Sequence, residues 1–361
     1  MSEGTGVTLR SDRGECYEDV AVGDQYLSPA RTVTEADVAA FAGLTGDYAP
    51  MYSDETYARR SAVGRRVAHG LLGLCLVEGL MIRVPPGEGR GIASLGWQWR
   101  FDAPLVPGDT VRASWEIVSK RRSQRRPDRG IVEEAVRLEN HRSEVIQGGV
   151  HAVLLACRGG ESDRESPAAP LALRTNADCG IACGELDPDA GAQRLLAASL
   201  APAERPDKIR VYFEDLAPGQ RFTSPRRTVT ERDVVSFAGI TGDFAMLHTD
   251  EEYCRGTEFG TRIAHGLLGL SLVEGFKRRV SQYAGPGDTM TPLALTWSFR
   301  KPIVPGDTLE VSWVIEATHP CRARAGGGWV VEEVRLLNQR AEVVQEGRQM
   351  QAVLRRPVSG A

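Results

Sequence analysis

The longest apolar stretches of the chain are two segments with nearly the same pattern. Residues 71–80 and 267–276 are apolar on almost every face, which is typical of a fully buried helix. Each follows an amphipathic segment, 34–41 or 230–237, that opens on a threonine suited to cap a helix. We therefore expect a short helix, an irregular loop and a buried helix, in that order, in each half of the chain.

After the buried helix, both halves turn to strand patterns. These segments alternate apolar and polar residues or are rich in β-branched ones, and they are 111–118, 130–140 and 150–157, then 309–315, 329–338 and 349–354. A buried helix followed by antiparallel strands predicts an α+β fold in which the sheet wraps the helix to cover it.

The two halves are copies of one another. Residues 41–79 and 237–275 align without a gap at an offset of 196 and are identical at 24 of 39 positions. Two long copies are a tandem duplication and not a repeat array. We predict an N-terminal unit over 1–158, a linker rich in Gly, Ser, Pro and charge over 159–208, and a C-terminal unit over 209–361, with the copies paired as a pseudo-dimer.

Composition narrows the function classes. The 361 residues are 42% hydrophobic and 25% charged, with a net charge of −4, so a nucleic-acid binder held by a bulk positive field is excluded. We expect no membrane span and, since the amino terminus lacks the pattern of a secretory signal, a cytoplasmic protein. Seven scattered cysteines indicate inert thiols, without the spacing of a metal site.

Three motifs carry a family resemblance. Thr-Gly-Asp-x-x-x-x-His-x-Asp over 241–250, Phe-Gly-x-x-Ile-Ala-His-Gly-Leu-Leu over 259–268 and Pro-Ile-Val-Pro-Gly-Asp-Thr over 302–308 resemble the MaoC-like dehydratase and (R)-specific enoyl-CoA hydratase family. The resemblance implies a double hotdog, in which each copy wraps a curved antiparallel sheet round a central helix. It also implies a hydro-lyase that uses no metal or cofactor and takes its substrate as a coenzyme A or phosphopantetheine thioester.

The two copies differ within the family's hydration signature. The second copy keeps Asp243 and His248, although Ala245 stands where the family has asparagine; the first copy keeps Asp47 but has Tyr52 in place of the histidine. By resemblance, Asp243 and His248 are the catalytic pair in the C-terminal unit. The degenerate first copy would then make room for the acyl chain.

Hydration of an enoyl thioester needs a base for the water proton and an acid for the α-carbon, roles that a carboxylate and an imidazole can share. The enolate oxygen needs fixed N–H donors, and Gly266, at the start of a buried helix, is our candidate for this oxyanion hole. Tyr52 is a poor base that can donate a hydrogen bond, and we favour a structural role for Asp47. Both residues are also candidates for substrate binding in the first copy. His69 and His265, present in both copies, are expected to cap or pack against the helices.

Basic residues suggest where a phosphate could bind. Arg121, Arg122 and Arg125 lie in a predicted hairpin, and Lys277 ends the second buried helix. A solvated hairpin tip is one interpretation; a contact with a coenzyme A phosphate or an acidic acyl carrier protein is the other.

Two other functions fit the same fold. A hotdog thioesterase could use Asp243 to aim water at the carbonyl, and a non-catalytic protein could bind acyl thioesters or carrier proteins within a fatty acid or polyketide pathway. Acyl length, branching, the choice of carrier, reaction direction and any further dimer of chains are not readable from the residues.

Overall fold

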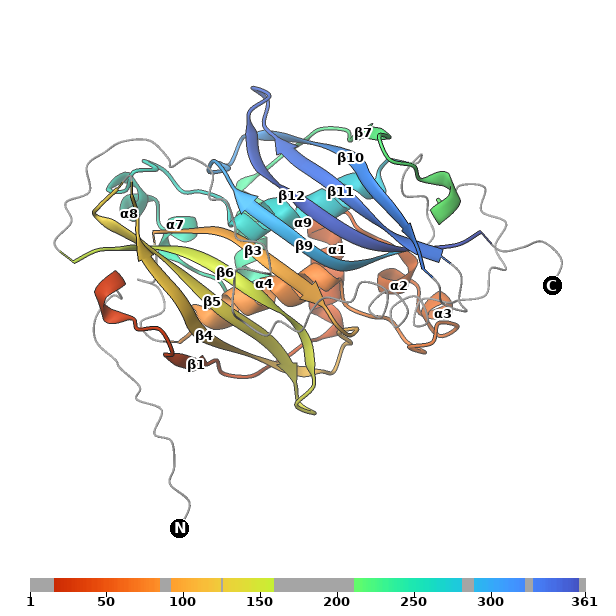
Figure 1. The fold of residues 1–361 in the computed structure, drawn as a ribbon, viewed down its shortest axis with the longest axis horizontal. Coiled ribbons are helices and arrows are strands. Elements are labelled where there is room, and N and C mark those ends of the chain that lie inside the picture. Colours follow the sequence, from red (N-terminus) through yellow and green to blue (C-terminus); the bar gives the residue numbers. More distant parts are fainter. Residues whose placement is uncertain are drawn as a thin grey trace, which may run out of the picture.

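The computed structural model describes residues 16–84, 92–124, 126–158, 211–280, 289–321 and 327–356. Its two halves lie side by side, each with a long helix against one face of a curved sheet (Figure 1). The predicted linker over 159–208 lies outside the described residues.

The N-terminal half follows the predicted order of helices and then strands. Its elements are η1 (Tyr17–Asp19), β1 (Gln25–Leu27), β2 (Arg31–Thr32), α1 (Glu35–Thr45), α2 (Pro50–Ser53), α3 (Glu55–Ala58), α4 (Gly70–Met81), β3 (Ala93–Phe101), β4 (Thr110–Arg122), β5 (Arg129–Asn140) and β6 (Val145–Ala156). The threonine cap of α1 is confirmed, since Thr34 accepts a hydrogen bond from the backbone N–H of Asp37, whose carboxylate binds Thr34 in return.

The C-terminal half repeats this order. Its elements are η3 (Phe213–Asp215), β7 (Arg221–Thr223), β8 (Arg227–Thr228), α6 (Glu231–Thr241), α7 (Met246–Thr249), α8 (Glu251–Arg255), α9 (Gly266–Arg278), β9 (Met290–Phe299), β10 (Thr308–Pro320), β11 (Gly327–Leu337) and β12 (Val343–Leu354). The two buried helices, α4 and α9, correspond to the segments whose apolar pattern predicted full burial, and their leucines belong to the hydrophobic core.

The strands of both halves form one antiparallel sheet. Their order is β1-β4-β5-β6-β3-β9-β12-β11-β10-β7, with β2 and β8 pairing on β4 and β10. The halves join where β3 pairs with β9, at Trp97 opposite Trp297. The sequence pattern does not predict β3 and β9, yet they convert two wrapped helices into one continuous structure.

The helices of the two halves also contact one another. Cys75 of α4 and Ser271 of α9, which are counterparts in the repeat, lie 3.4 Å apart between Sγ and Oγ. A Cβ on Gly79 would lie 2.0 Å from the carbonyl oxygen of Thr241, so glycine is required for α4 to pack on the end of α6. A Cβ on Gly275 of α9 would likewise overlap the carbonyl oxygen of Thr45 at the end of α1.

An arginine from each half satisfies the end of a helix in the other. Arg31 donates to the carbonyl of Ile240 at 2.6 Å, and Arg227 donates to that of Leu44 at 2.6 Å. These carbonyls lie in the last turns of α6 and α1, where intrahelical partners run out. The predicted pseudo-dimer is therefore an interlocked pair.

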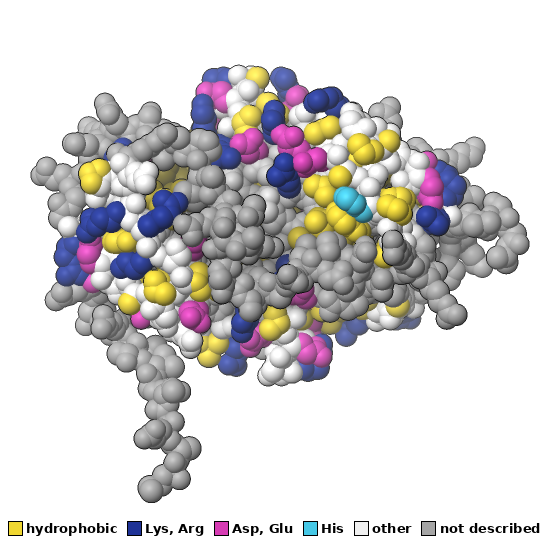
Figure 2. All heavy atoms as spheres, in the orientation of Figure 1, with side chains coloured by type: hydrophobic (Ala, Val, Ile, Leu, Met, Phe, Trp, Pro, Cys, Tyr) yellow, Lys and Arg dark blue, Asp and Glu magenta, His cyan; other side chains and the backbone are white. Residues whose placement is uncertain are grey.

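The described surface carries both signs of charge. Figure 2 shows Lys and Arg interspersed with Asp and Glu on the face that it presents, in keeping with the small net charge. Among the described residues, no helix has the length and apolar character needed to cross a membrane.

Candidate active site

A left-handed turn places Asp243 in the interior. α6 ends at Gly242, whose φ of 86° favours glycine and whose N–H donates to the carbonyl of Ala238. Asp243 follows at once, 5% exposed, and its Oδ1 accepts the backbone N–H of Ala245 at 3.1 Å. The same carboxylate therefore shapes the loop and remains available to a substrate.

The hydrogen bond of His248 fixes its tautomer. Its Nδ1 lies 2.8 Å from the carbonyl oxygen of Ile263. Because a carbonyl only accepts, Nδ1 carries the proton and Nε2 of the neutral ring keeps a lone pair. Burial lowers the pKa of His248 more than the carboxylate of Asp243 raises it, so the neutral form dominates near pH 7.

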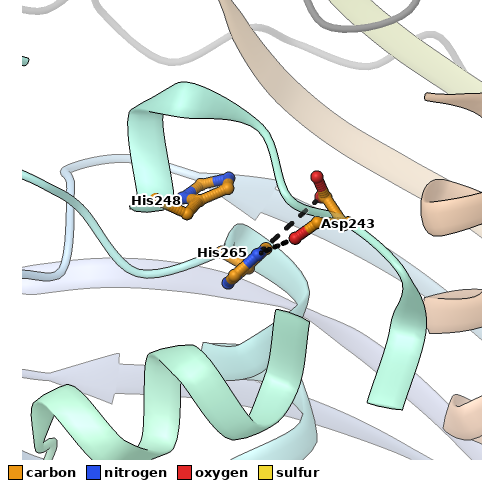
Figure 3. Close-up of side chains that lie close together, drawn as sticks. All are labelled: Asp243, His248 and His265. Atoms are coloured by element: carbon orange, nitrogen blue, oxygen red, sulfur yellow. Dashed lines mark hydrogen bonds and ion pairs between the residues drawn. The ribbon is translucent and has the colours of Figure 1, made fainter. Parts of the chain in front are cut away.

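His265 completes a cluster of three side chains (Figure 3). Its Nε2 donates to the backbone carbonyl of Asp243 at 2.9 Å, and its ring stacks on that of His248 with centroids 3.7 Å apart. Burial and the neighbouring imidazole of His248 hold the pKa of His265 well below its usual value. Of the two expected roles of His69 and His265, capping is wrong, because neither side chain bonds its own helix start, and packing is confirmed. The ring of His69 lies 5.1 Å from that of Phe41 on α1, and the ring of His265 lies 4.7 Å from that of Phe237 on α6, between centroids.

The same cluster contains groups that could hold a metal ion, since one ligand atom from each residue lies within 4.8 Å of the others. The hydrogen bonds decide which atoms are free to do so. Nε2 of His265 and Nδ1 of His248 carry protons for carbonyl acceptors, so the lone pairs in the cluster belong to the Asp243 carboxylate, His248 Nε2 and His265 Nδ1. A carboxylate and a neutral imidazole suit acid/base chemistry on water as well as metal binding.

The other half contributes a carboxyl group to this site. Glu78 lies on α4 next to Gly79, which packs on the Thr241–Asp243 segment. Burial, followed by the negative charge of Asp243, raises the pKa of Glu78 to about 8, with the indole of Trp97 acting against this shift. At neutral pH, Glu78 therefore holds a proton and can donate a hydrogen bond.

Gly266 is the first residue of α9, as predicted. Gln345 fixes its peptide, donating to the Gly266 carbonyl at 2.9 Å while accepting from the indole of Trp297 at 2.9 Å. A Cβ on Gly266 would lie 2.9 Å from the ring of Phe299. A larger residue here would have to displace this ring, whereas glycine leaves the free N–H groups of the first turn approachable.

The first copy keeps the contact between the histidine and the loop carbonyl but has a tyrosine at the position of His248. His69 donates to the backbone carbonyl of Asp47 at 2.8 Å, and the ring of Tyr52 lies on His69 with centroids 3.8 Å apart, where the second copy has His248. Arg278 of α9 forms an ion pair with Asp47 at 3.3 Å. The counterpart of Arg278 at the other site is Ile82, so the repeat supplies this cation to the Asp47 carboxylate and not to that of Asp243.

A cavity that is partly open to solvent lies over this Asp47 site. Its walls come from both halves and include Asp47, Tyr52, His69, Gly70, Phe101, Glu274, Arg278, Pro292, Leu295 and Gln349. The Asp47 site is therefore built from the loop of one copy and from a helix and strands of the other. The repeat predicts the matching walls at the Asp243 site to be Glu78, Ser94, Trp97 and His151.

The candidate phosphate contacts do not lie together. Arg121 and Arg122 are exposed at the end of β4, where Arg122 pairs with Glu18 at 2.8 Å, and Arg125 lies outside the described residues. Lys277 does not fit the surface contact expected of it, because its ammonium is buried against Glu332 at 2.7 Å. The hairpin base does reach the C-terminal half, through Arg129 and Glu258 at 3.0 Å.

Sequence reasoning missed Glu78 and the role of His265. Both had a signal in the alignment of the copies. An acid recurs at 78 and 274 within helices that are otherwise apolar, and a histidine recurs at 69 and 265. A recurring ionisable residue in a fully buried segment indicates a partner that the segment itself does not contain.

Comparison with known proteins places this site in context. The 3-hydroxybutyryl-CoA dehydratase of Methylorubrum extorquens is 37% identical over 120 residues, which cover 33% of this chain and 73% of that protein. The (R)-specific enoyl-CoA hydratase of Rhodospirillum rubrum is 33% identical over 114 residues, covering 32% of this chain and 76% of that one.

Solved structures share the whole architecture. A MaoC domain protein dehydratase from Chloroflexus aurantiacus superposes with a TM-score of 0.75 at 19% identity, covering 97% of this chain and 100% of its own. A Mycobacterium tuberculosis protein with a double hotdog fold gives a TM-score of 0.68 at 18% identity, covering 94% and 98%. The MaoC like domain matches residues 19–137 and 214–327, more than half of the sequence, and the chain belongs to the MaoC-like dehydratase family.

Proposed function

We propose that the protein reversibly hydrates a 2-enoyl thioester to a 3-hydroxyacyl thioester at the Asp243 site. The observation that carries this proposal is the pairing of a buried carboxylate with a neutral imidazole whose Nε2 is free to accept a proton. The names of the relatives support the reaction class, since they are 3-hydroxyacyl dehydratases and enoyl-CoA hydratases.

In the hydration direction, a water molecule between His248 and Asp243 attacks the β-carbon. Nε2 of His248 takes one proton from this water as its oxygen bonds to the β-carbon. The imidazolium then returns that proton through the Asp243 carboxylate to the α-carbon, so that both side chains regain their starting protonation states. Glu78, protonated near pH 7, carries no negative charge there, which limits the repulsion between the two carboxyl groups. Dehydration runs the same steps in reverse.

Negative charge develops on the thioester oxygen as the β-carbon is attacked. The first turn of α9 offers N–H donors and the positive end of a 13-residue helix at Gly266. Because Gln345 already holds the Gly266 peptide, these donors need no reorganisation during the reaction. Ala245, in the place of the family's asparagine, offers no side-chain donor, so we assign orientation of the thioester to the backbone.

The Asp47 site is proposed to be inactive in hydration. Tyr52 has no basic nitrogen, and Arg278 neutralises the carboxylate of Asp47. The apolar part of its cavity, from Phe101 to Leu295, suits an acyl chain. Arg121 and Arg122 remain candidates for the phosphate of a coenzyme A or carrier-protein thioester. The reaction as written needs no metal or redox cofactor, and we keep the cytoplasm as the proposed location.

A direct assay separates this proposal from thioester hydrolysis and from simple binding. The protein is incubated with 2-enoyl-CoA thioesters of several chain lengths, while the absorbance of the conjugated enoyl group and free thiol are followed in parallel. Hydration predicts loss of absorbance without release of thiol. Unchanged absorbance with every CoA and carrier-protein thioester in the panel would contradict the proposal.

A further inference from the structure

Three side chains of the N-terminal half form a hydrogen-bonded line that hydration does not use. Ser94 Oγ on β3 lies 2.8 Å from Nε2 of His151 on β6, and Nδ1 of His151 lies 3.0 Å from Oε2 of Glu134 on β5. The imidazole is held flat against Trp97, with centroids 4.0 Å apart and planes within 10°. Since a carboxylate only accepts, Nδ1 carries the proton and Nε2 accepts from the hydroxyl of Ser94.

Solvent exposure increases along these three side chains, from the carboxylate to the hydroxyl. Glu134 is 2% exposed and His151 is 7% exposed, whereas Ser94 is only partly buried. A hydroxyl, an imidazole and a buried carboxylate joined in this order form the geometry that activates a serine nucleophile, whatever the fold that carries it.

The fold does not require this arrangement. In the C-terminal half the same positions hold Pro292, Gln349 and Glu332, and the strands pair in the same register. There the acid bonds Lys277 on α9, and Gln349 donates to Glu274 at 2.8 Å. In that half, the buried carboxylate and amide thus have hydrogen-bond partners although the three positions include neither a serine nor a histidine.

The repeat places the line at the Asp243 site. Pro292 and Gln349, the counterparts of Ser94 and His151, both line the cavity over Asp47. The ring of Pro292 comes within 3.3 Å of the position that a Cβ on Gly70 would take. The repeat therefore predicts that Ser94 lies beside Gly266, where the helix N–H groups would receive a carbonyl oxygen.

A second contact supports this placement independently of the alignment. Gly79 on α4, in the same half as Ser94, packs on the catalytic loop, with a Cβ there lying 3.3 Å from the backbone nitrogen of Asp243. The N-terminal half therefore forms the wall of the Asp243 site.

We propose that Ser94 is the nucleophile of an acyl-transfer site that cleaves acyl thioesters, with His151 as its base and Glu134 as a positioning residue. The choice of an acyl thioester as substrate rests on the proposed function; the nucleophile itself rests on the hydrogen-bonded line alone.

The step balances with water as the only co-reactant. Ser94 Oγ attacks the thioester carbonyl while its proton passes to His151 Nε2, and the oxyanion forms next to the N–H groups at Gly266. The C–S bond then breaks, the thiolate takes the proton from the imidazolium, and an acyl ester remains on Ser94. Water, deprotonated by His151, hydrolyses this ester to a free acid and restores the serine.

A saturated substrate separates this activity from hydration, because butyryl-CoA has no double bond to hydrate. We expect the full-length protein to release thiol from butyryl-CoA and to gain one butyryl group on Ser94, detected by intact and peptide mass spectrometry. Ser94→Ala should release thiol at least about 100-fold more slowly. Ser114→Ala, a serine-to-alanine change on β4, is the matched control and should keep the wild-type rate, and His248→Ala should keep thiol release while losing hydration.

Two variants test the base and its positioning residue. His151→Gln carries the residue that the other half has at this position, so it should fold and lose thiol release. Glu134→Gln should lower kcat of thiol release with little change in KM, and Glu134→Asp should recover part of kcat, which a purely structural role would not produce. Circular dichroism melting of each variant reports that it is folded.

A fluorophosphonate probe tests the nucleophile without any thioester. It should label Ser94 in the wild-type protein and in His248→Ala, but not in His151→Gln. Thiol release that persists in Ser94→Ala would overturn the proposal, as would a wild-type protein that hydrates enoyl-CoA yet neither releases thiol nor is labelled. Labelling without thiol release would overturn thioester cleavage, whereas loss of enoyl hydration alone would count only against the proposed function.

Discussion

Replacing Glu78 with glutamine removes the carboxyl group that α4 places against Asp243. In the folded protein the pKa of Glu78 rises from 4.5 to about 8, because of burial and the charge of Asp243. The folded state therefore holds this proton more tightly than the unfolded state does. The stability that the group contributes is complete below pH 4.5 and is lost as the pH rises through about 8.

The magnitude follows from the two pKa values. At about 1.4 kcal/mol per pH unit, ionisation of this carboxyl group lowers the free energy of unfolding by about 4 kcal/mol between about pH 5 and pH 9. The glutamine side chain of the variant cannot ionise. The difference in the free energy of unfolding, Glu78→Gln minus wild type, should therefore become more positive by about 4 kcal/mol over this interval.

Urea unfolding followed by circular dichroism at several pH values measures this difference. Glu274→Gln is the matched control, because the carboxylate of Glu274 accepts a hydrogen bond from Gln349 and its neighbour Asp47 is paired with Arg278. The control measures what the loss of a carboxyl group at the counterpart position of the other buried helix costs by itself. If the Glu78→Gln difference stayed constant from acid to alkaline pH, the placement of Glu78 against Asp243 would be refuted.

Three further predictions concern the sites. Arg278→Ile should lower the free energy of unfolding, measured in urea, by about 3 kcal/mol, because Asp47 is left buried without its cation. Hydration at the Asp243 site should persist in this variant. Loss of hydration activity together with stability would contradict two separate sites. Gly266→Ala should reduce kcat/KM for hydration about tenfold to a hundredfold, since the new Cβ displaces Phe299 and blocks the carbonyl, and wild-type kinetics would rule out the oxyanion assignment. Dialysis against a chelator should leave hydration unchanged; a loss that added zinc restores would make the cluster of Asp243 and two histidines a metal centre.

Much of the fold could be predicted because each apolar or strand pattern occurs twice, once in each copy. The segments 71–80 and 267–276 are so evenly apolar that only burial explains them, and the structure extends them by a residue or two at each end, as α4 and α9. β3 and β9 were missed because their exposed and buried residues do not alternate cleanly. These two strands lie where the halves join, so residues of both halves decide which of their side chains are buried. The apolar pattern of one half alone therefore does not show a strand.

The site was only partly predictable for a related reason. The Asp243 loop is local, so its spacing indicated acid/base chemistry, and the resemblance assigned the roles. Glu78 and Arg278 reach their sites across the interface between the halves, and no local pattern encodes that crossing. The prediction for Lys277 was wrong because charge at a helix end usually indicates solvent; here Glu332 on the facing strand compensates the buried ammonium.

The asymmetry between the copies is the central claim, and one pair of variants tests it most directly. In the enoyl-CoA hydration assay, His248→Ala should lower kcat/KM by a factor of about 10² to 10⁴, the range of a lost general base. Tyr52→Phe should keep most of the activity, because the Asp47 site takes no part in the chemistry. Activity that vanished in Tyr52→Phe and survived in His248→Ala would contradict this account.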